Sequence, residues 1–266
     1  MESFETSRQE LLAALAADPE MLKSLAEQLR HEFDENLEQS HDFLQLLTQV
    51  QGNAEAILLD KHPGMDVDLA AEKSPHEGAI FFAAKLMKVK IDSLVYLQEI
   101  NRVHGGETRF QIHPFILKYV RIYKWQAEQR ELRIRLDGSS YAAVFLSGDA
   151  VGAVVQALLD NMVKYAPAGS NATVEFAESG DRVAVSFRSI GPRIEKEEMS
   201  KIFLPRYRAV SARRIESLGQ GIGLATAKSI SDVLGLQLSV EQDADPHPSY
   251  SGRFSTTFSL SFTKAV

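Results

Sequence analysis

A glycine cluster near the C-terminus is the stretch of this sequence best suited to hold a phosphate group. Gly219, Gly221 and Gly223 alternate along the chain, and Leu224 begins the apolar, helix-forming stretch that follows them. Glycines let backbone N–H groups come close to a ligand, and the N-terminus of a helix carries a partial positive charge. The cluster therefore predicts a phosphate-binding turn, with a plain helix-capping turn as the alternative.

Three further blocks precede this cluster, and the order of all four is informative. The earlier blocks are Leu158–Pro167, Gly191–Ile194 and Ile202–Arg208. In this order and spacing, the four resemble the asparagine box, first glycine box, phenylalanine box and second glycine box of the ATP-binding domain of sensor histidine kinases. The same boxes occur in the wider gyrase, Hsp90, kinase and MutL (GHKL) ATPase family. The resemblance covers residues 105 to 263 and implies that family's Bergerat-type fold, a two-layer α/β sandwich.

The resemblance also implies ligands for Mg²⁺ and ATP. Mg·ATP requires an oxygen ligand for the metal, a cation for the phosphates and a backbone cradle. Asn161 matches the metal-ligating asparagine, and Lys164, on the same helical face, is placed to reach phosphate. The residues expected to bind ATP are Asn161, Lys164, Tyr165, Ser189, Gly191, Arg208, Gly219, Gly221, Gly223 and Leu224.

Three positions depart from the family pattern. Ser189 stands where the family has an aspartate that accepts a hydrogen bond from the adenine amino group. A hydroxyl also accepts, but losing a charge-assisted bond predicts ATP binding weaker by roughly tenfold. Arg193 replaces a glycine and is expected either to crowd the nucleotide or to force an unfavourable backbone. Ala157 replaces the glutamate base of hydrolytic relatives, which argues against a gyrase-like ATPase.

The N-terminal half reads as a helical hairpin. Two stretches carry apolar residues at helical spacing, and they are separated by Lys61–Gly64 and by a polar loop that ends in a capping box at Ser74–Glu77. The two apolar seams are Phe43, Leu47, Val50, Ala54 and Ile57, and then Ile80, Ala84, Met87, Ile91 and Leu94. Because both seams need a partner, we expect two hairpins to form a dimeric four-helix bundle.

A histidine on the first arm is the candidate phospho-acceptor. The stretch Ser40–Glu55 is similar to the HDFNNLLT-type acceptor box of one histidine kinase group, with His41 as nucleophile and Asp42 as the group that orients or deprotonates it. His31, which an acid also follows, is the alternative. Counted from the turn, His41 lies level with the second arm, whereas His31 lies level with its break at Gly105.

Composition limits the remaining possibilities. The chain has 266 residues, a net charge of −7 and no cysteine, which excludes disulfides and thiolate chemistry. Basic residues are interspersed with acidic ones, which argues against a nucleic-acid groove. Since no apolar stretch approaches the roughly 18 residues of a membrane span, we expect a cytoplasmic protein without a span in this chain.

These observations predict three regions. Residues 1–39 form a helical extension, residues 40–104 the dimerisation and phosphotransfer hairpin, and residues 105–266 the ATP-binding domain, with a hinge at Gly105–Gly106. In the last region we expect strands at 109–113, 132–136, 142–146, 237–241 and 254–262, a hairpin at 173–188, and helices at 114–130 and 149–164.

The predicted function is that of a two-component sensor histidine kinase. It would act as a homodimer, autophosphorylate from Mg·ATP and pass the phosphoryl group to a response-regulator receiver domain. The alternative is a non-catalytic histidine phosphotransfer or scaffold protein whose ATP site has decayed.

Overall fold

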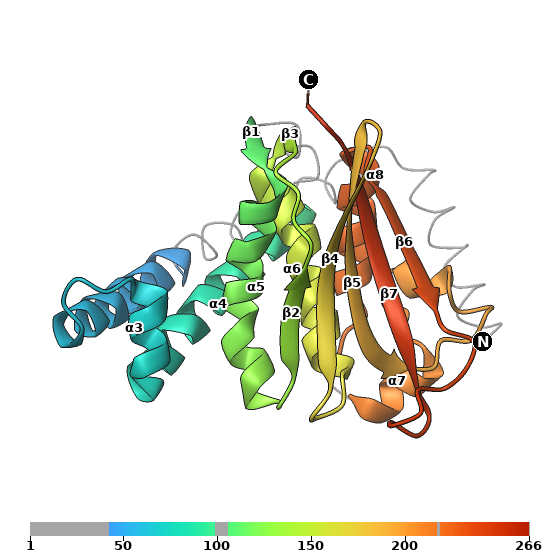
Figure 1. The fold of residues 1–266 in the computed structure, drawn as a ribbon, viewed down its shortest axis with the longest axis horizontal. Coiled ribbons are helices and arrows are strands. Elements are labelled where there is room, and N and C mark those ends of the chain that lie inside the picture. The colour runs from blue at the N-terminus through green and yellow to red at the C-terminus, as the bar shows by residue number, and fades with distance from the viewer. Residues whose placement is uncertain (1–42, 99–105, 217–218, 266) are drawn as a thin grey trace, which may run out of the picture. The chain divides into compact units, whose positions relative to one another are not determined.

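The computed structural model describes residues 43–98, 106–216 and 219–265 (Figure 1). The chain divides into two compact units, Met1–Leu46 and Leu47–Val266, and nearly all described residues belong to the second. The predicted helical extension at residues 1–39 and the two candidate acceptor histidines lie outside the described residues. Within the described part of the chain, no helix combines the length and apolarity that crossing a bilayer requires.

The described N-terminal part is helical, as the sequence predicts. Residues 43–61 form one helix, and α4 (Pro75–Gln98) begins at the predicted proline. The connection, expected to be a loop, contains the short helix α3 (Val67–Lys73). The Asp66 side chain caps α3 by accepting hydrogen bonds from the backbone N–H groups of Asp68 and Leu69.

The helices of this region pack around a second, smaller core, which Trp125 from the C-terminal part also contacts. Its buried members are Ala54, Leu58, Ala70, Ala71, Phe81 and Phe82. Gly78 permits the close approach of α3 and α4, because a Cβ atom there would lie 2.1 Å from the Ala71 carbonyl oxygen. The core does not cover the predicted seams completely, since Val50, Ile57, Ile80 and Met87 remain exposed.

The C-terminal part is a two-layer α/β sandwich, as predicted. Its strands and helices, in chain order, are β1 (Glu107–Gln111), α5 (Ile112–Gln129), β2 (Arg133–Asp137), β3 (Ala143–Ser147), α6 (Gly148–Tyr165), β4 (Asn171–Ser179), β5 (Arg182–Pro192), η2 (Lys201–Phe203), α7 (Val210–Ile215), α8 (Gly223–Val233), β6 (Gln237–Gln242) and β7 (Arg253–Thr263).

Five of the strands form one sheet in the order β2-β4-β5-β7-β6. Only the β2–β4 pair is parallel, and the other three pairs are antiparallel. β1 and β3 pair with each other in a separate two-stranded sheet, a grouping that the sequence pattern did not predict. The boundaries also differ from those expected, because α5 begins at Ile112 and β5 continues to Pro192.

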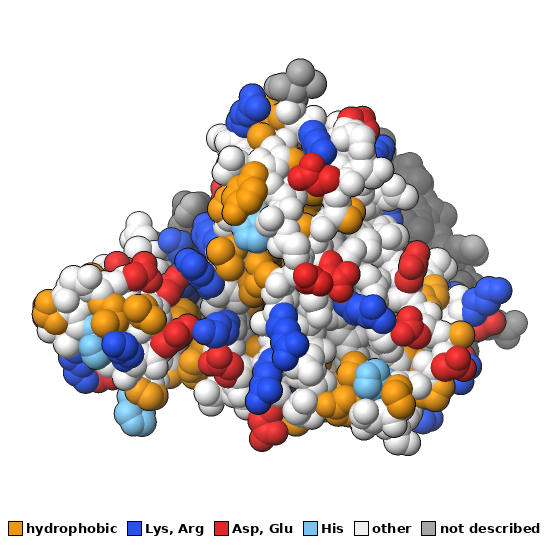
Figure 2. Space-filling view, in the orientation of Figure 1, with side chains coloured by type: hydrophobic (Ala, Val, Ile, Leu, Met, Phe, Trp, Pro, Cys, Tyr) orange, Lys and Arg blue, Asp and Glu red, His pale blue; other side chains and the backbone are white. Residues whose placement is uncertain are grey.

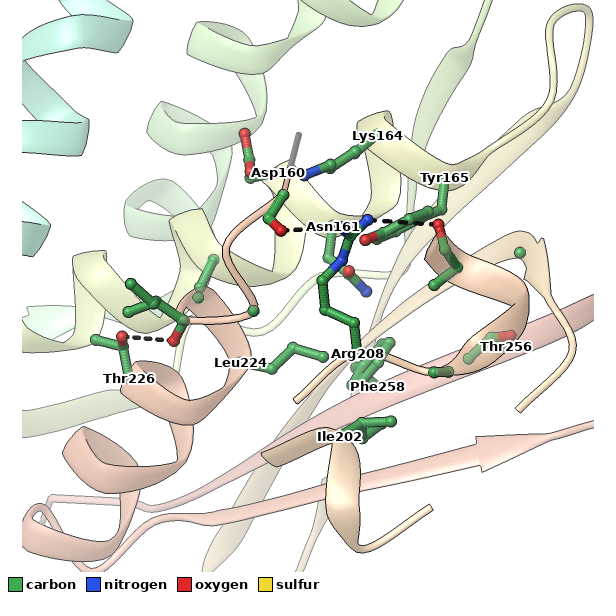
Figure 3. A pocket seen from close by; sticks show the side chains of 18 of the residues that line it. Asp160, Asn161, Lys164, Tyr165, Ile202, Arg208, Leu224, Thr226, Thr256 and Phe258 are labelled. Atoms are coloured by element: carbon green, nitrogen blue, oxygen red, sulfur yellow. Dashed lines mark hydrogen bonds between the residues drawn. The ribbon is translucent and has the colours of Figure 1, made fainter. Parts of the chain in front are cut away.

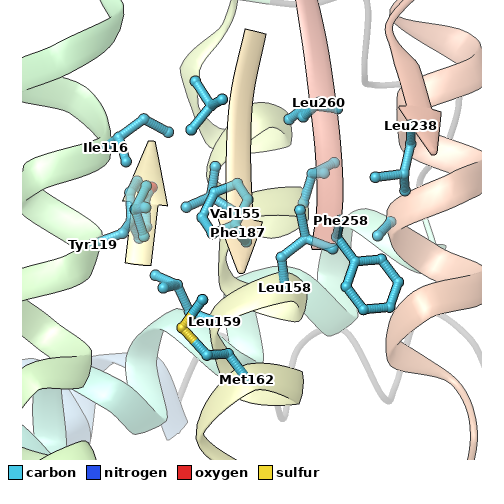
Figure 4. Close-up of a cluster of buried hydrophobic side chains, with 14 of the residues drawn as sticks. Ile116, Tyr119, Val155, Leu158, Leu159, Met162, Phe187, Leu238, Phe258 and Leu260 are labelled. Carbon is cyan, nitrogen blue, oxygen red and sulfur yellow. The ribbon is translucent and has the colours of Figure 1, made fainter. Parts of the chain in front are cut away.

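The main core lies between the five-stranded sheet and the helices α5, α6 and α8 (Figure 4). Its register follows the apolar alternation, because Val185 pairs with Leu260 and Phe187 with Phe258. α6 contributes more residues to this core than any other helix or strand, and Leu158 and Leu159 on it are fully buried. This alternation stops at the end of β5, where consecutive residues from Ile190 to Pro192 are all buried.

Helices α5 and α6 approach each other at Gly152. A Cβ atom at this position would lie 2.0 Å from the hydroxyl oxygen of Tyr119, whose ring is itself buried. We expect Gly152→Ala to lower the free energy of unfolding by about 1–3 kcal/mol, because the ring cannot shift without disturbing the core. Guanidinium unfolding would measure this change.

Gly52 supplies the matched control. It lies on the helix of residues 43–61, and a Cβ atom added there would meet nothing within 4 Å, so Gly52→Ala is expected to stabilise by about 0.5–1 kcal/mol. Equal effects of the two substitutions would contradict the inference that the α5–α6 contact requires glycine.

Candidate active site

The end of α6, the ends of β5 and β7 and the segments 207–212 and 219–224 enclose a cavity of about 490 Å³ (Figure 3). Four stretches that are distant in sequence meet there. The cavity is lined by all ten residues expected to bind ATP: Asn161, Lys164, Tyr165, Ser189, Gly191, Arg208, Gly219, Gly221, Gly223 and Leu224. His41 and Asp42, the other predicted site residues, lie outside the described residues.

The glycine cluster lies directly against the end of the phenylalanine box, Ile202–Arg208. The backbone N–H of Arg206 donates to the Gly221 carbonyl at 2.9 Å. Gly221 has a φ of +71°, and a Cβ atom there would lie 2.6 Å from the Tyr207 carbonyl oxygen. The position therefore requires glycine both for its backbone conformation and for the space available.

Two cations converge on the cluster. At Gly219 a Cβ atom would lie 2.6 Å from Lys164 Nζ and 3.1 Å from the guanidinium carbon of Arg208. Arg208 crosses the middle of the cavity in Figure 3. Its guanidinium donates to the carbonyl oxygens of Gly219 at 2.9 Å and Ala212 at 3.4 Å, and also to that of Glu216. This end of the cavity is therefore suited to an anion, because two positive groups lie beside Gly219 and the start of α8 lines the same cavity.

A buried glutamate, Glu198, holds the stretch from Tyr207 to Val210 in place. The sequence pattern did not identify this residue. Glu198 is only 8% exposed. Its carboxylate accepts from the Tyr207 hydroxyl at 2.9 Å and from the backbone N–H groups of Val210 at 3.1 Å and Glu195 at 3.2 Å. Burial alone would raise the pKa of Glu198, but these hydrogen bonds outweigh it and lower the pKa. In sequence, Glu198 looks like one more member of a charged surface run.

The opposite end of the cavity is mainly apolar. Ile194, Ile202 and Phe258 line it, together with the hydroxyl-bearing Ser189 and Thr256. In Figure 3 this end lies away from Asp160 and Lys164. Thr256 was not identified from the sequence, because nothing in the pattern of β7 distinguishes it from the neighbouring serines and threonines. An apolar region with two hydroxyls suits an uncharged ring such as a purine better than a charged group.

Arg193 does not obstruct the cavity, so the expectation that it crowds the site is wrong. Its Nε lies 3.0 Å from the Glu195 carboxylate, and its guanidinium carbon lies 5.8 Å from the centroid of the Phe254 ring. It is absent from the cavity lining and has no positive φ. The side chain turns outward because an acidic and an aromatic partner are available at the surface.

Three further polar residues line the cavity beside α6. They are Tyr123, Gln156 and Asp160. Burial, and secondarily the charge of Asp160, raises the pKa of the Tyr123 hydroxyl, which therefore stays protonated. Ala157 also lines the cavity, and Asp160 is the single carboxylate among the described lining residues.

The C-terminal part of the chain matches a known family, and longer stretches are similar to sensor proteins. Residues 147–265 match the family described as histidine kinase-, DNA gyrase B- and HSP90-like ATPase. The chain is 28% identical over 209 residues to the swarming motility regulation sensor protein RssA of Serratia marcescens, covering 76% of this chain and 39% of that protein. It is 29% identical over 163 residues to the probable sensor kinase SilS of Salmonella typhimurium, covering 60% and 33%. The chain thus spans less than half the length of these curated relatives.

Solved structures show the same fold. The nucleotide-free catalytic domain of the histidine kinase ThkA aligns with a TM-score of 0.50 at 17% identity, covering 60% of this chain and 96% of that one. Full-length ShkA in complex with AMPPNP aligns with a TM-score of 0.54 at 17% identity, covering 88% of this chain and 46% of that one.

The Glu198 carboxylate gives a pH-dependent prediction. Glu198→Gln should cost about 1–3 kcal/mol of stability at pH 7, because an amide cannot accept all three hydrogen bonds. Since the folded-state pKa is lowered, this contribution is complete above the unfolded pKa of roughly 4.3 and is lost as the pH falls through the folded value. Thermal unfolding at a series of pH values should therefore show the two proteins converging in acid.

Glu197→Gln is the control for Glu198, because it removes the same charge from an exposed neighbouring position. Its effect should stay within about 0.5 kcal/mol at every pH. A gap between wild type and Glu198→Gln that persisted unchanged in acid would contradict the role assigned to the carboxylate.

The glycine cluster can be tested by two alanine substitutions. Gly221→Ala should destabilise by at least about 1–2 kcal/mol, the cost of a left-handed L-residue, and more because its Cβ meets backbone. Gly223→Ala places a methyl group in open space at the first residue of α8 and should leave the melting temperature nearly unchanged. Thermal unfolding of both variants checks this difference, and equal losses would contradict it.

Proposed function

We propose that this chain phosphorylates its own His41 from Mg·ATP. Residues 147–265 match the histidine kinase-, DNA gyrase B- and HSP90-like ATPase family, and the chain has a histidine kinase catalytic core. The phosphoryl group would then pass to an aspartate of a response-regulator receiver domain. The observation that carries this proposal is the cavity, where Lys164, Arg208 and the glycine cluster form an anion site beside an apolar slot.

The residues present fit a nucleoside triphosphate with its metal. Lys164 and Arg208 would hold phosphate oxygens, and the lack of side chains at Gly219 and Gly223 leaves room for backbone N–H groups to do the same. Asn161 offers the side-chain oxygen that Mg²⁺ prefers. When bound, Mg²⁺ would neutralise charge on the phosphate oxygens. The complex of ShkA with AMPPNP supports nucleotide binding by this fold.

In the proposed transfer, an imidazole nitrogen of His41 attacks the γ-phosphorus in line with the bond to ADP, which breaks as the new P–N bond forms. Asp42 orients the ring or accepts its proton. The absence of a carboxylate on Ala157 is consistent with transfer to a side chain, since no water has to be activated from that position. His31 remains the alternative acceptor.

A homodimer is proposed for the helical region. Val50, Ile57, Ile80 and Met87 lie on its two long helices and are each about half exposed, between 46% and 53%. Apolar side chains at helical spacing on both arms are the usual material of a bundle interface. The proposed site of action is the cytoplasm, where ATP and receiver domains are available.

The alternative function is non-catalytic phosphotransfer or scaffolding with a decayed ATP site. Ser189 motivated this alternative together with Arg193, and Arg193 faces outward. The cavity keeps its glycine cluster and both cations, which favours the kinase.

Nucleic acid is not among the proposed partners. On the face shown in Figure 2, acidic and basic side chains are mixed.

The proposal predicts self-labelling with radioactive Mg·ATP. The label on the full chain should be stable to alkali and labile to acid, as a phosphohistidine is, and His41→Gln should abolish it. His31→Gln should keep most of it.

Asn161→Ala should eliminate labelling, because it removes the proposed metal ligand. The dimer should stay intact, which size-exclusion chromatography with light scattering would verify.

Each of the contrary outcomes would overturn a different part of the proposal. Labelling that survives His41→Gln and disappears in His31→Gln would move the acceptor to His31. Wild-type labelling by Asn161→Ala would overturn the assignment of the asparagine. Undetectable nucleotide binding at millimolar Mg·ATP would overturn the kinase and favour the non-catalytic alternative.

A further inference from the structure

The apolar end of the cavity carries polar side chains from three neighbouring strands, β5, β7 and β6. Ser189 on β5 is directly opposite Thr256 on β7, and Thr256 is directly opposite Gln242 on β6. Directly paired residues have Cβ atoms about 4.5–5.5 Å apart. Ser189 and Thr256 belong to the same inward-facing sets as Phe187 and Phe258, so both hydroxyls lie where the apolar core gives way to the cavity.

The side-chain amide of Gln242 has only one possible orientation. The backbone N–H of Ile194 donates to Oε1 at 2.8 Å, and Nε2 donates to the Pro192 carbonyl at 2.9 Å. An N–H group cannot accept and a carbonyl cannot donate, so the oxygen and nitrogen of the amide cannot be exchanged. The second hydrogen of Nε2 is then donated to Thr256 Oγ1 at 2.7 Å.

This contact gives the Thr256 hydroxyl a defined polarity. Its oxygen accepts from Gln242, so its own proton remains to be donated. Thr256 is only 5% exposed, and no second side-chain hydrogen bond of Thr256 occurs within the described residues. Because a buried donor without an acceptor is costly, a ligand atom that accepts a hydrogen bond is favoured beside it.

Ser189 supplies the complementary group. Its hydroxyl can rotate to donate or to accept, and within the described residues its side chain is not engaged in a hydrogen bond. An ionised aspartate, which the family pattern has at this position, can only accept. It therefore favours the 6-amino group of adenine and repels the 6-oxo group of hypoxanthine or guanine.

We propose that the purine end of this cavity accepts 6-oxopurine nucleoside triphosphates as well as ATP, and that Ser189 sets this tolerance. With adenine, Thr256 donates to ring N1 and Ser189 accepts from the 6-amino group. With a 6-oxopurine held in the same way, the Ser189 hydroxyl turns to donate to O6 and accepts from the Thr256 hydroxyl opposite it, while the second lone pair of Thr256 Oγ1 accepts from N1–H. Each base thus finds one donor and one acceptor. This inference rests on the proposed function, because it requires the cavity to bind a nucleoside triphosphate.

ITP is the most direct probe, since it has the 6-oxo group without the 2-amino group that guanine adds. We would measure displacement of a fluorescent ATP analogue from the full chain by Mg·ATP and by Mg·ITP. The two affinities should differ by less than about tenfold, because neither base leaves a buried polar group unsatisfied.

Two variants whose new side chains have the same shape test whether Ser189 sets the tolerance. Ser189→Asp supplies only an acceptor, so it should tighten ATP and weaken ITP, widening the ratio beyond about tenfold. Ser189→Asn has the same shape, offers both a donor and an acceptor, and should keep the ratio below that value. Similar ratios in the two variants would overturn the role of Ser189. Thermal unfolding would confirm that both are folded.

The wild-type measurement alone distinguishes a failure of the base tolerance from a failure of the proposed function. Displacement by ATP with ITP at least tenfold weaker would overturn the tolerance and leave the kinase intact. Displacement by neither nucleotide would overturn the proposed function itself.

Discussion

The close contact between Gly221 and the end of the phenylalanine box is the constraint on which the cavity depends. The Arg206 N–H bonds to the Gly221 carbonyl at 2.9 Å, and no side chain fits between Gly221 and Tyr207. This contact brings Arg208 and Lys164 to the same position beside Gly219. Two cations held together repel each other, so an anion between them relieves the repulsion. The same geometry that closes the loop therefore makes this end of the cavity suited to an anion.

Helix α6 connects the site to the stability of the fold. One side of the helix buries Leu158 and Leu159 against the sheet, while Asn161 and Lys164 reach the cavity one turn later. The strands contribute in the same way, because Phe187 is buried in the core and Ser189, two residues further along the same face, lines the cavity. Polar groups at the rim are thus positioned by close-packed neighbours, which restricts their movement.

The predictable part of the site consists of residues whose role depends on local sequence. The sequence itself shows glycines at alternate positions before a helix and an asparagine three residues before a lysine. All ten of the residues expected to bind ATP line the cavity. Glu198 could not be recognised in this way. Its burial depends on donors from Tyr207 and Val210, which approach it only after the chain has turned back.

Local sequence was sufficient to predict most of the helices and strands and the α/β class, because periodicity and caps act within a few residues. The separate pairing of β1 with β3, the outward direction of Arg193 and the polarity of the Thr256 hydroxyl became known only from the folded chain. These features depend on partners that are distant in sequence, such as Gln242 beside Pro192. A single sequence does not state which distant groups become neighbours, and hydrogen-bond polarity is set by neighbours.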